Sequence, residues 1–188
     1  MESIIKENIT GFLDQNNVVS TGQHGFVKDR SCLTNLLESL EQWTLALDNG
    51  YGVDVLYLDY RKAFDSVPHK RLIYKLSSVG LHGKLLSWLS FFLSNRIMRV
   101  GVRGSYSTWF QMISGVPQGS VLGPILFLLY VNDLPNWIKC SMRMFADDTK
   151  IWNIIKSDSD CSTLQMFWFN GLTNGSFTSI LTSVRWWA

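Results

Sequence analysis

The sequence predicts a mixed α+β fold built around a single core. Three observations predict it: several segments repeat apolar residues at helical spacing, residues 53–59 form a run of β-forming residues, and two strand-like runs flank an Asp-Asp pair within residues 141–152. With 188 residues, 46% of them hydrophobic, the chain can bury one core of ordinary domain size or form much of a larger domain.

The composition narrows the class of protein. Seventeen Lys and Arg against fifteen Asp and Glu give a net charge of +2, which neither supports nor excludes a nucleic-acid partner. Three cysteines without a CxxC pair argue against a disulfide framework, so an intracellular setting is expected. The N-terminus has no apolar signal region, and the longest apolar run, residues 121–131, is too short to span a bilayer. We therefore expect no membrane association.

Helices are predicted in both the N-terminal and middle parts of the chain. Apolar spacing predicts an amphipathic helix over residues 3–15 and another over 33–47, with Ser31 as its N-cap. Between them, the irregular loop 23–31 holds His24 and Arg30, which either contact a ligand or face solvent. The same reasoning predicts two further helices, at residues 69–79 and 84–93.

Residues 53–59 predict a central strand that is buried on both faces and ends in Asp59. A carboxylate at the end of a buried strand needs a cation or hydrogen-bond donors to offset its loss of water. A salt bridge with Arg61 or Lys62 would meet that need, and so would a functional site. Farther on, residues 96–113 predict two strands joined by residues 103–105.

A glycine- and proline-rich loop, residues 114–124, precedes an apolar helix that is predicted to end at Pro135. Three glycines in nine residues allow the backbone to approach a ligand closely, although a tight structural turn has the same composition. The amide of Gln118 projects from this loop. The predicted hairpin 141–152 follows, with Asp147 and Asp148 at its tip, a pattern that by itself is most often a solvated turn.

Taken together, these segments resemble the central motifs of reverse transcriptases, most of all those of non-LTR (LINE-type) retrotransposons. The resemblance lies in GQHGFVKDRSC (22–32), YLDYRKAFDSVPH (57–69), SGVPQGSVLGP (114–124) and FADDT (145–149). It implies an RNA-directed DNA polymerase, a nucleotidyltransferase that uses an RNA template, a DNA primer and dNTPs. The implied fold is a polymerase palm, an antiparallel sheet backed by helices, with partial fingers and no thumb.

The resemblance also implies a metal site. It places Asp59 and Asp147 on two Mg²⁺ ions, with Mn²⁺ as an alternative, the Tyr60 carbonyl on the triphosphate-bound ion, and Asp148 in the same cluster. Mg²⁺ prefers oxygen ligands. Without metal, repulsion among the clustered carboxylates should raise the pKa of at least one of them. Asp65 is expected to cap a helix or to brace a loop.

The substrate-binding residues implied by the resemblance lie on both sides of these acids. Phe64 would lie beneath the incoming sugar and exclude a ribose 2′-hydroxyl, although plain core packing is the alternative. Gln118 would contact the nucleotide or template, and Gly119 would permit the close approach. Arg30 and Lys62 would face phosphates.

The sequence departs from the family pattern at its end. We expect the reverse transcriptase domain, with partial fingers and the palm, to cover residues 1–165. Residues 166–188 form a divergent tail without Asp, Glu or Lys. Its composition resembles the product of translation in a wrong reading frame, and the alternative is a divergent apolar segment that packs on the domain. The lysine and thumb expected there are absent, and we expect this chain to lack the other domains of a parent polyprotein, such as an endonuclease. A catalytically inactive retroelement remnant, with at most weak nucleic-acid binding, is therefore the second hypothesis.

Overall fold

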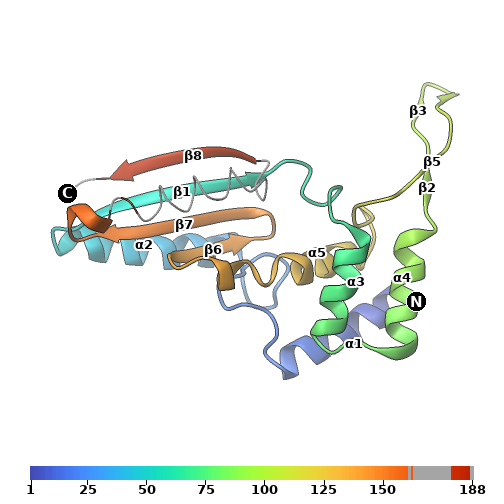
Figure 1. Ribbon diagram of the computed structural model, residues 1–188, viewed down its shortest axis with the longest axis horizontal. Helices are drawn as coiled ribbons and strands as arrows, with labels where there is room; N and C mark the ends of the chain where they lie inside the picture. Colours follow the sequence, from blue (N-terminus) through green and yellow to red (C-terminus); the bar gives the residue numbers. More distant parts are fainter. Residues whose placement is uncertain (161, 163–178, 187–188) are drawn as a thin grey trace. The chain divides into compact units, whose positions relative to one another are not determined.

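The computed structural model describes residues 1–160, 162 and 179–186, and it has the mixed α+β content that the sequence predicts (Figure 1). Its helices are α1 (Glu2–Gln15), α2 (Cys32–Asp48), α3 (His69–Ser78), α4 (Gly83–Ser94), α5 (Gly123–Val131) and the 3₁₀ turns η1 (Leu134–Trp137) and η2 (Asp158–Asp160). Its strands are β1 (Gly52–Tyr60), β2 (Ile97–Met98), β3 (Gly101–Val102), β4 (Ser105–Tyr106), β5 (Phe110–Gln111), β6 (Ser141–Phe145), β7 (Asp148–Ile155) and β8 (Ser179–Trp186). The chain forms two compact units: a helical unit, residues 1–19 and 62–131, and a sheet unit, residues 20–61 and 132–188.

The sheet unit is built on a four-stranded antiparallel sheet in the order β6-β7-β1-β8. The predicted central strand is confirmed, because β1 lies between β7 and β8 and is buried from Gly52 to Leu56. Its predicted burial does not extend to its end, since Tyr57 and Asp59 are exposed. The predicted hairpin is confirmed as β6 and β7. Of the predicted divergent tail, residues 179–186 form β8, and the remaining positions lie outside the described residues.

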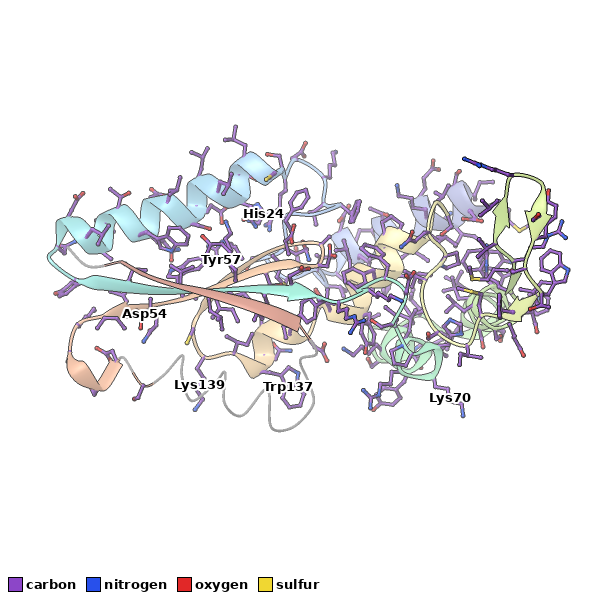
Figure 2. All side chains as sticks on the ribbon, turned by 90° about the horizontal axis from the view of Figure 1, so that it is seen from above. His24, Asp54, Tyr57, Lys70, Trp137 and Lys139 are labelled. Carbon is purple, nitrogen blue, oxygen red and sulfur yellow. The ribbon has the colours of Figure 1, made fainter. Side chains whose placement is uncertain are left out.

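The two faces of this sheet carry separate apolar clusters, because successive side chains of a strand point to opposite sides. Val53, Val55 and Trp152 pack with Ala46 on the α2 side, where the Trp43 ring meets Trp152 edge-on at 5.8 Å. The opposite cluster consists of Leu56, Leu58, Ile138, Met142, Met144 and Ile151. Figure 2 shows this division, with Tyr57 on the α2 side and Asp54 on the side of Trp137 and Lys139.

Helix α2 begins where the sequence predicts, since Ser31 and Thr34 form a reciprocal capping box. Its buried side, however, is mostly polar. Asn35 and Ser39 are buried with Ala46, whereas the leucines that define its periodicity are largely exposed: Leu33, Leu36, Leu37 and Leu40. The helix therefore packs on the sheet through small and polar residues together with the partly buried Trp43 and Leu47.

The helical unit buries one side of each of its helices. Leu72 and Leu76 of α3 and Leu89 and Leu93 of α4 are almost fully buried, as the apolar spacing predicts. Nearly all of α5 is buried, which explains its continuous apolar sequence. Within the described part of the chain, no helix is long and apolar enough to cross a membrane.

Two of the predicted elements differ in detail from those in the structure. The apolar helix does not continue to residue 134: α5 ends at Val131, and η1 is a separate turn with Pro135 near its start, where a missing N–H costs nothing. The two strands predicted over residues 96–113 are four short ones. Their turn consists of Arg103 and Gly104, both with positive φ, as a tight two-residue hairpin turn requires.

Candidate functional site

Asp147, one of the three predicted catalytic carboxylates, lies at the tip of the β6–β7 hairpin. Phe145 pairs with Asp148, so that Ala146 and Asp147 form a two-residue turn. Ala146 has a φ of 56°, a left-handed conformation that is unfavourable for a residue with a Cβ atom. The surroundings must therefore stabilise this turn, because its sequence does not favour it.

The predicted carboxylates lie at one end of the sheet. Leu58 of β1 pairs with Thr149 of β7, so the next step of the register brings Asp59 opposite Asp148. Asp147 is only partly exposed. Burial raises its pKa above the ordinary value, and the negative charges of Asp148 and Asp59 raise it further. The sheet thus gathers the three carboxylates, and their mutual repulsion is felt at Asp147.

The chemistry of these donors fits a hard cation. Within the described part of the chain, no group of three or more His, Cys, Asp and Glu side chains is arranged to hold a metal ion. Yet Asp59, Asp147 and Asp148 supply only oxygen donors, and the charge repulsion that raises the pKa of Asp147 is what a divalent cation would relieve.

Tyr60 ends strand β1, directly after Asp59. Burial raises the pKa of its hydroxyl to about 12, against a smaller opposite effect of a hydrogen bond with the Thr149 side chain. The hydroxyl is therefore neutral at physiological pH. The Tyr60 carbonyl follows directly on the residue that carries the Asp59 carboxylate.

A buried glutamine that the sequence reasoning did not single out holds the hairpin tip. Gln23 is only 2% exposed, and its Oε1 accepts hydrogen bonds from the backbone N–H groups of Ala146 (2.9 Å) and Gly25 (2.8 Å). Its Nε2 donates to the Ala146 carbonyl at 3.5 Å. A Cβ atom on Gly25 would lie 2.3 Å from the Ala146 nitrogen, so only glycine permits this approach. We call residues 22–25 the bracing loop.

The bracing loop runs along the free edge of β6. The Met144 N–H donates to the Gly22 carbonyl, and the His24 N–H donates to the Met144 carbonyl, both at 2.8 Å. Asn35 of α2 donates to the same Met144 carbonyl at 3.0 Å. The loop thus acts as an additional edge of the sheet beside the strand that leads to Asp147.

Arg30, predicted to face phosphates, contacts the chain itself. Its guanidinium donates to the carbonyls of Thr21 and Gln23, the latter at 2.7 Å. This contact ties the polar loop after residue 25 back onto the bracing loop. Part of the hydrogen-bonding capacity of Arg30 is therefore used within the fold.

A buried histidine joins the bracing loop to helix α2 (Figure 2). His24 is 1% exposed, and its ring nitrogens lie 2.9 Å from the Thr34 hydroxyl and 3.4 Å from a Glu38 oxygen. Arg143 of β6 donates to the same Glu38 oxygen at 2.6 Å. Burial lowers the pKa of His24 below its ordinary 6.5 and outweighs the attraction of Glu38.

This arrangement predicts a loss of stability on mild acidification. Because the folded pKa of His24 is lowered, the unfolded chain takes up its proton first, and the free energy of unfolding should fall as the pH drops below about 6.5. Urea unfolding between pH 7.5 and 5.5 measures this slope. His24→Asn should flatten it, and an unchanged slope in that variant would contradict the assignment.

The helical unit holds four of the residues predicted to bind substrate, Lys62, Phe64, Gln118 and Gly119, whereas Arg30 and Tyr60 belong to the sheet unit. The Phe64 ring stacks on Phe127 of α5 with ring centres 4.2 Å apart, and it remains partly exposed. Gln118 donates from Nε2 to an Asp65 carboxylate oxygen at 3.3 Å. The Asp65 carbonyl accepts from the Ser114 hydroxyl at 2.9 Å, so Asp65 braces the 114–124 loop, as predicted.

The glycines of this loop have different roles. A Cβ atom on Gly115, whose φ is +89°, would lie 2.8 Å from the Asp65 carbonyl oxygen, so this glycine permits contact within the protein. Gly119 has a φ of +77° but faces open space. The Ser120 hydroxyl accepts from the Gly123 N–H at 2.9 Å and leads into α5. Lys62, also predicted to bind substrate, is exposed.

The sequence reasoning thus found residues that lie in two groups. Asp59, Tyr60, Asp147 and Asp148 share one end of the sheet, whereas Phe64 and Gln118 lie in the helical unit, Gln118 within the 114–124 loop that Asp65 braces. The reasoning missed Gln23, whose only sequence signal is its place in the segment 22–32 that resembles a family motif.

Residues 1–167 match the model of the reverse transcriptase (RNA-dependent DNA polymerase) family. Among curated proteins, a probable RNA-directed DNA polymerase from transposon X-element of Drosophila melanogaster is 32% identical, over 78% of this chain and 17% of that protein. The RNA-directed DNA polymerase from mobile element jockey of the same organism is 28% identical, over 84% of this chain and 18% of that protein. The chain therefore spans less than a fifth of the length of these relatives.

Solved structures support the fold independently of sequence. Apo telomerase from Candida tropicalis superimposes with a TM-score of 0.71 at 10% identity, covering all of this chain and 37% of that one. A form of that telomerase truncated from the C-terminal domain gives 0.69 at 11% identity, covering 97% and 40%. With the family match over nearly nine tenths of the chain, these findings show that it belongs to the reverse transcriptase family and is related to the enzymes of non-LTR retrotransposons.

Proposed function

We propose that this chain carries the catalytic part of an RNA-directed DNA polymerase, which adds a dNTP to the 3′-hydroxyl of a DNA primer paired with an RNA template. One observation carries the proposal: the strand register and the hairpin turn bring Asp59, Asp147 and Asp148 to one end of an antiparallel sheet. Burial raises the pKa of Asp147, and the charges of the other two raise it further. In this proposal residues 1–165 form the polymerase part and residues 166–188 a divergent tail.

The residues that would hold two Mg²⁺ ions, or Mn²⁺, are the three carboxylates and the carbonyl of Tyr60. Divalent cations at such sites stabilise the attacking and leaving oxygens of an in-line displacement. The protein's own contribution is positional. Strand pairing fixes Asp59 and Asp148, and the bracing loop holds Ala146 beside Asp147.

On the substrate side, each residue has a proposed partner. Phe64 would face the sugar of the incoming nucleotide, and Gln118, held by Asp65, would contact the nucleotide or the template. Open space beside Gly119 leaves room for that approach. Lys62 is exposed and available to a phosphate, whereas Arg30 would reach one only with the donors not directed at the bracing loop.

The proposed role of Phe64 predicts a change in sugar selectivity. The stacking on Phe127 holds the ring in place, so Phe64→Val should open space for a 2′-hydroxyl without removing a catalytic group. We expect the ratio of kcat/KM for dNTP to that for rNTP to fall roughly 10- to 100-fold, the range typical of small steric changes in a pocket. Single-nucleotide incorporation measures the ratio. If Phe64 serves only core packing, both values should fall together.

Primer extension by the 188-residue chain tests the proposed function. We expect Mg²⁺-dependent incorporation of dNTPs into a labelled DNA primer on an RNA template, abolished by a chelator. Circular dichroism would first establish that the chain is folded. Absence of incorporation by folded protein at any concentration would overturn the proposal in favour of the second candidate, an inactive retroelement remnant.

A further inference from the structure

The helical unit carries a ribbon of strands for which the catalytic proposal has no use. Strands β2 and β5 continue into β3 and β4, and the ribbon projects beyond helix α4 (Figure 1). Hydrogen bonds outside the regular pairing hold it together: the Ser107 N–H donates to the Val100 carbonyl at 2.8 Å, and the Met112 N–H donates to the Arg96 carbonyl at 2.9 Å. We call residues 96–113 the ribbon arm.

All of the chain's excess positive charge lies in the ribbon arm. It contains Arg96, Arg99 and Arg103 and no acidic residue. The other 170 residues hold 14 basic and 15 acidic side chains, a net charge of −1. The near-neutral composition of the whole chain therefore hides a local cationic element.

One of these arginines is built into an aromatic stack. The Arg99 guanidinium lies 4.0 Å from the Tyr106 ring centre and 4.7 Å from that of Trp109. A Cβ atom on Gly101 would come within 2.8 Å of the Tyr106 ring, so the glycine allows the ring to lie against the ribbon. Stacking uses the face of the guanidinium and leaves its edge, where the N–H donors lie, to bind other groups.

The same surface is widely exposed. Tyr106 is 63%, Trp109 57% and Phe110 51% exposed, which is unusual for large aromatic side chains. Exposed aromatic rings beside arginines, in a segment without acidic residues, suit a nucleic acid as partner. Bases stack on the rings, and guanidinium groups bind the phosphates between them.

We propose that the ribbon arm binds single-stranded nucleic acid, with the sugar-phosphate backbone on Arg96, Arg99 and Arg103 and unpaired bases on Tyr106 and Trp109. This surface lies outside the residues proposed for catalysis. Binding to it requires neither divalent metal nor dNTP. Its test therefore succeeds or fails independently of polymerase activity.

The experiment is fluorescence anisotropy of a dye-labelled single-stranded RNA with the full chain, titrated at several salt concentrations without divalent metal. The charge variant is R96Q/R99Q/R103Q. We expect it to bind roughly 10- to 100-fold more weakly at low salt, with the slope of log K against log salt reduced by about 2, the value for three lost phosphate contacts. Trp109→Ala should weaken binding roughly fivefold or more through lost stacking.

The matched control is K6Q/K70Q/K84Q, which removes the same charge from exposed positions on the helices of the same unit. We expect this control to change affinity less than about threefold. Equal losses in the two triple variants would overturn the proposal, as would undetectable RNA binding by the folded wild-type chain. The proposal would also fail if the arm variants bound RNA normally but changed the sedimentation coefficient, because the arm would then be a protein interface.

Discussion

Asp147→Asn is expected to abolish nucleotide incorporation and, without divalent cations, to raise the melting temperature of the chain. The two effects have one physical cause. The Asp147 carboxylate is partly buried at the hairpin tip, where burial and the charges of Asp148 and Asp59 raise its pKa. Asparagine keeps the shape and one acceptor oxygen but removes the charge, so the metal-free fold loses a repulsion and the proposed metal site loses a ligand.

The loss of incorporation and the gain in stability are expected to differ greatly in size. A metal ligand that stabilises transition-state charge contributes several kcal/mol, so incorporation should fall by about 10³-fold or more. The gain in stability should be a few degrees, since about 1 kcal/mol shifts the melting temperature by roughly 2–4 °C in a chain of this size. Single-turnover primer extension and differential scanning calorimetry in chelator measure the two effects.

Asp160→Asn is the matched control in the same unit. Asp160 is an exposed carboxylate that accepts hydrogen bonds from the Lys156 and Ser157 N–H groups at 3.0 and 2.9 Å, and these bonds lower its pKa. The same change should therefore lower the melting temperature and leave incorporation intact. If Asp147→Asn behaved like Asp160→Asn in both measurements, Asp147 would be an ordinary surface acid and the proposed site would be wrong.

The elements that hold Asp147 were predictable to different degrees. The hairpin and the central strand were predictable because both signals are local: apolar runs predict the strands, and the acid pair at 147–148 between two such runs places the turn near it. The turn itself consists of Ala146 and Asp147, because Asp148 already begins β7. The capping box at Ser31 is equally local. The order of the strands, which brings Asp59 opposite Asp148, depends on contacts about 90 residues apart in the chain and came only from the resemblance to a family.

The packing of α2 shows why local reasoning fails elsewhere. Its leucine spacing correctly predicts a helix, but the spacing does not say which side meets the sheet. Asn35 and Ser39 are buried there, and Asn35 donates to the Met144 carbonyl, a partner 109 residues away. Where a helix is fixed by hydrogen bonds to a distant strand, apolar periodicity alone cannot identify its buried face.

The role of Gln23 also depends on a distant contact, with Ala146, and could not be predicted from local patterns. Replacement of Gln23 should produce the second large effect that we expect. Gln23→Ala should lower both stability and catalytic rate, because the side chain satisfies the N–H groups of Gly25 and Ala146 in a place where water has little access. Each buried donor left without a partner costs about 1–3 kcal/mol, so the melting temperature should fall by roughly 5–15 °C.

The catalytic loss should exceed what unfolding alone explains. Ala146 holds a left-handed conformation with φ of 56°, and the Gln23 amide contacts both its N–H and its carbonyl. Without that brace the turn can relax and displace the adjacent Asp147. A displacement of about 1 Å can cost 10²-fold in rate. Measured well below the melting temperature, Gln23→Ala should therefore be roughly 10- to 100-fold slower and require more Mg²⁺ for half-maximal rate.

Two further variants separate positioning from general stability. Gln23→Glu keeps an acceptor for both N–H groups and should recover part of the rate and of the Mg²⁺ response, although its buried charge limits the gain in stability. Gln15→Ala, at an exposed position, should change nothing. A Gln23→Ala protein that is less stable but has the wild-type Mg²⁺ response would show that the brace supports only the fold. A shifted response, partly restored by glutamate, would make Gln23 a positioning residue for Asp147.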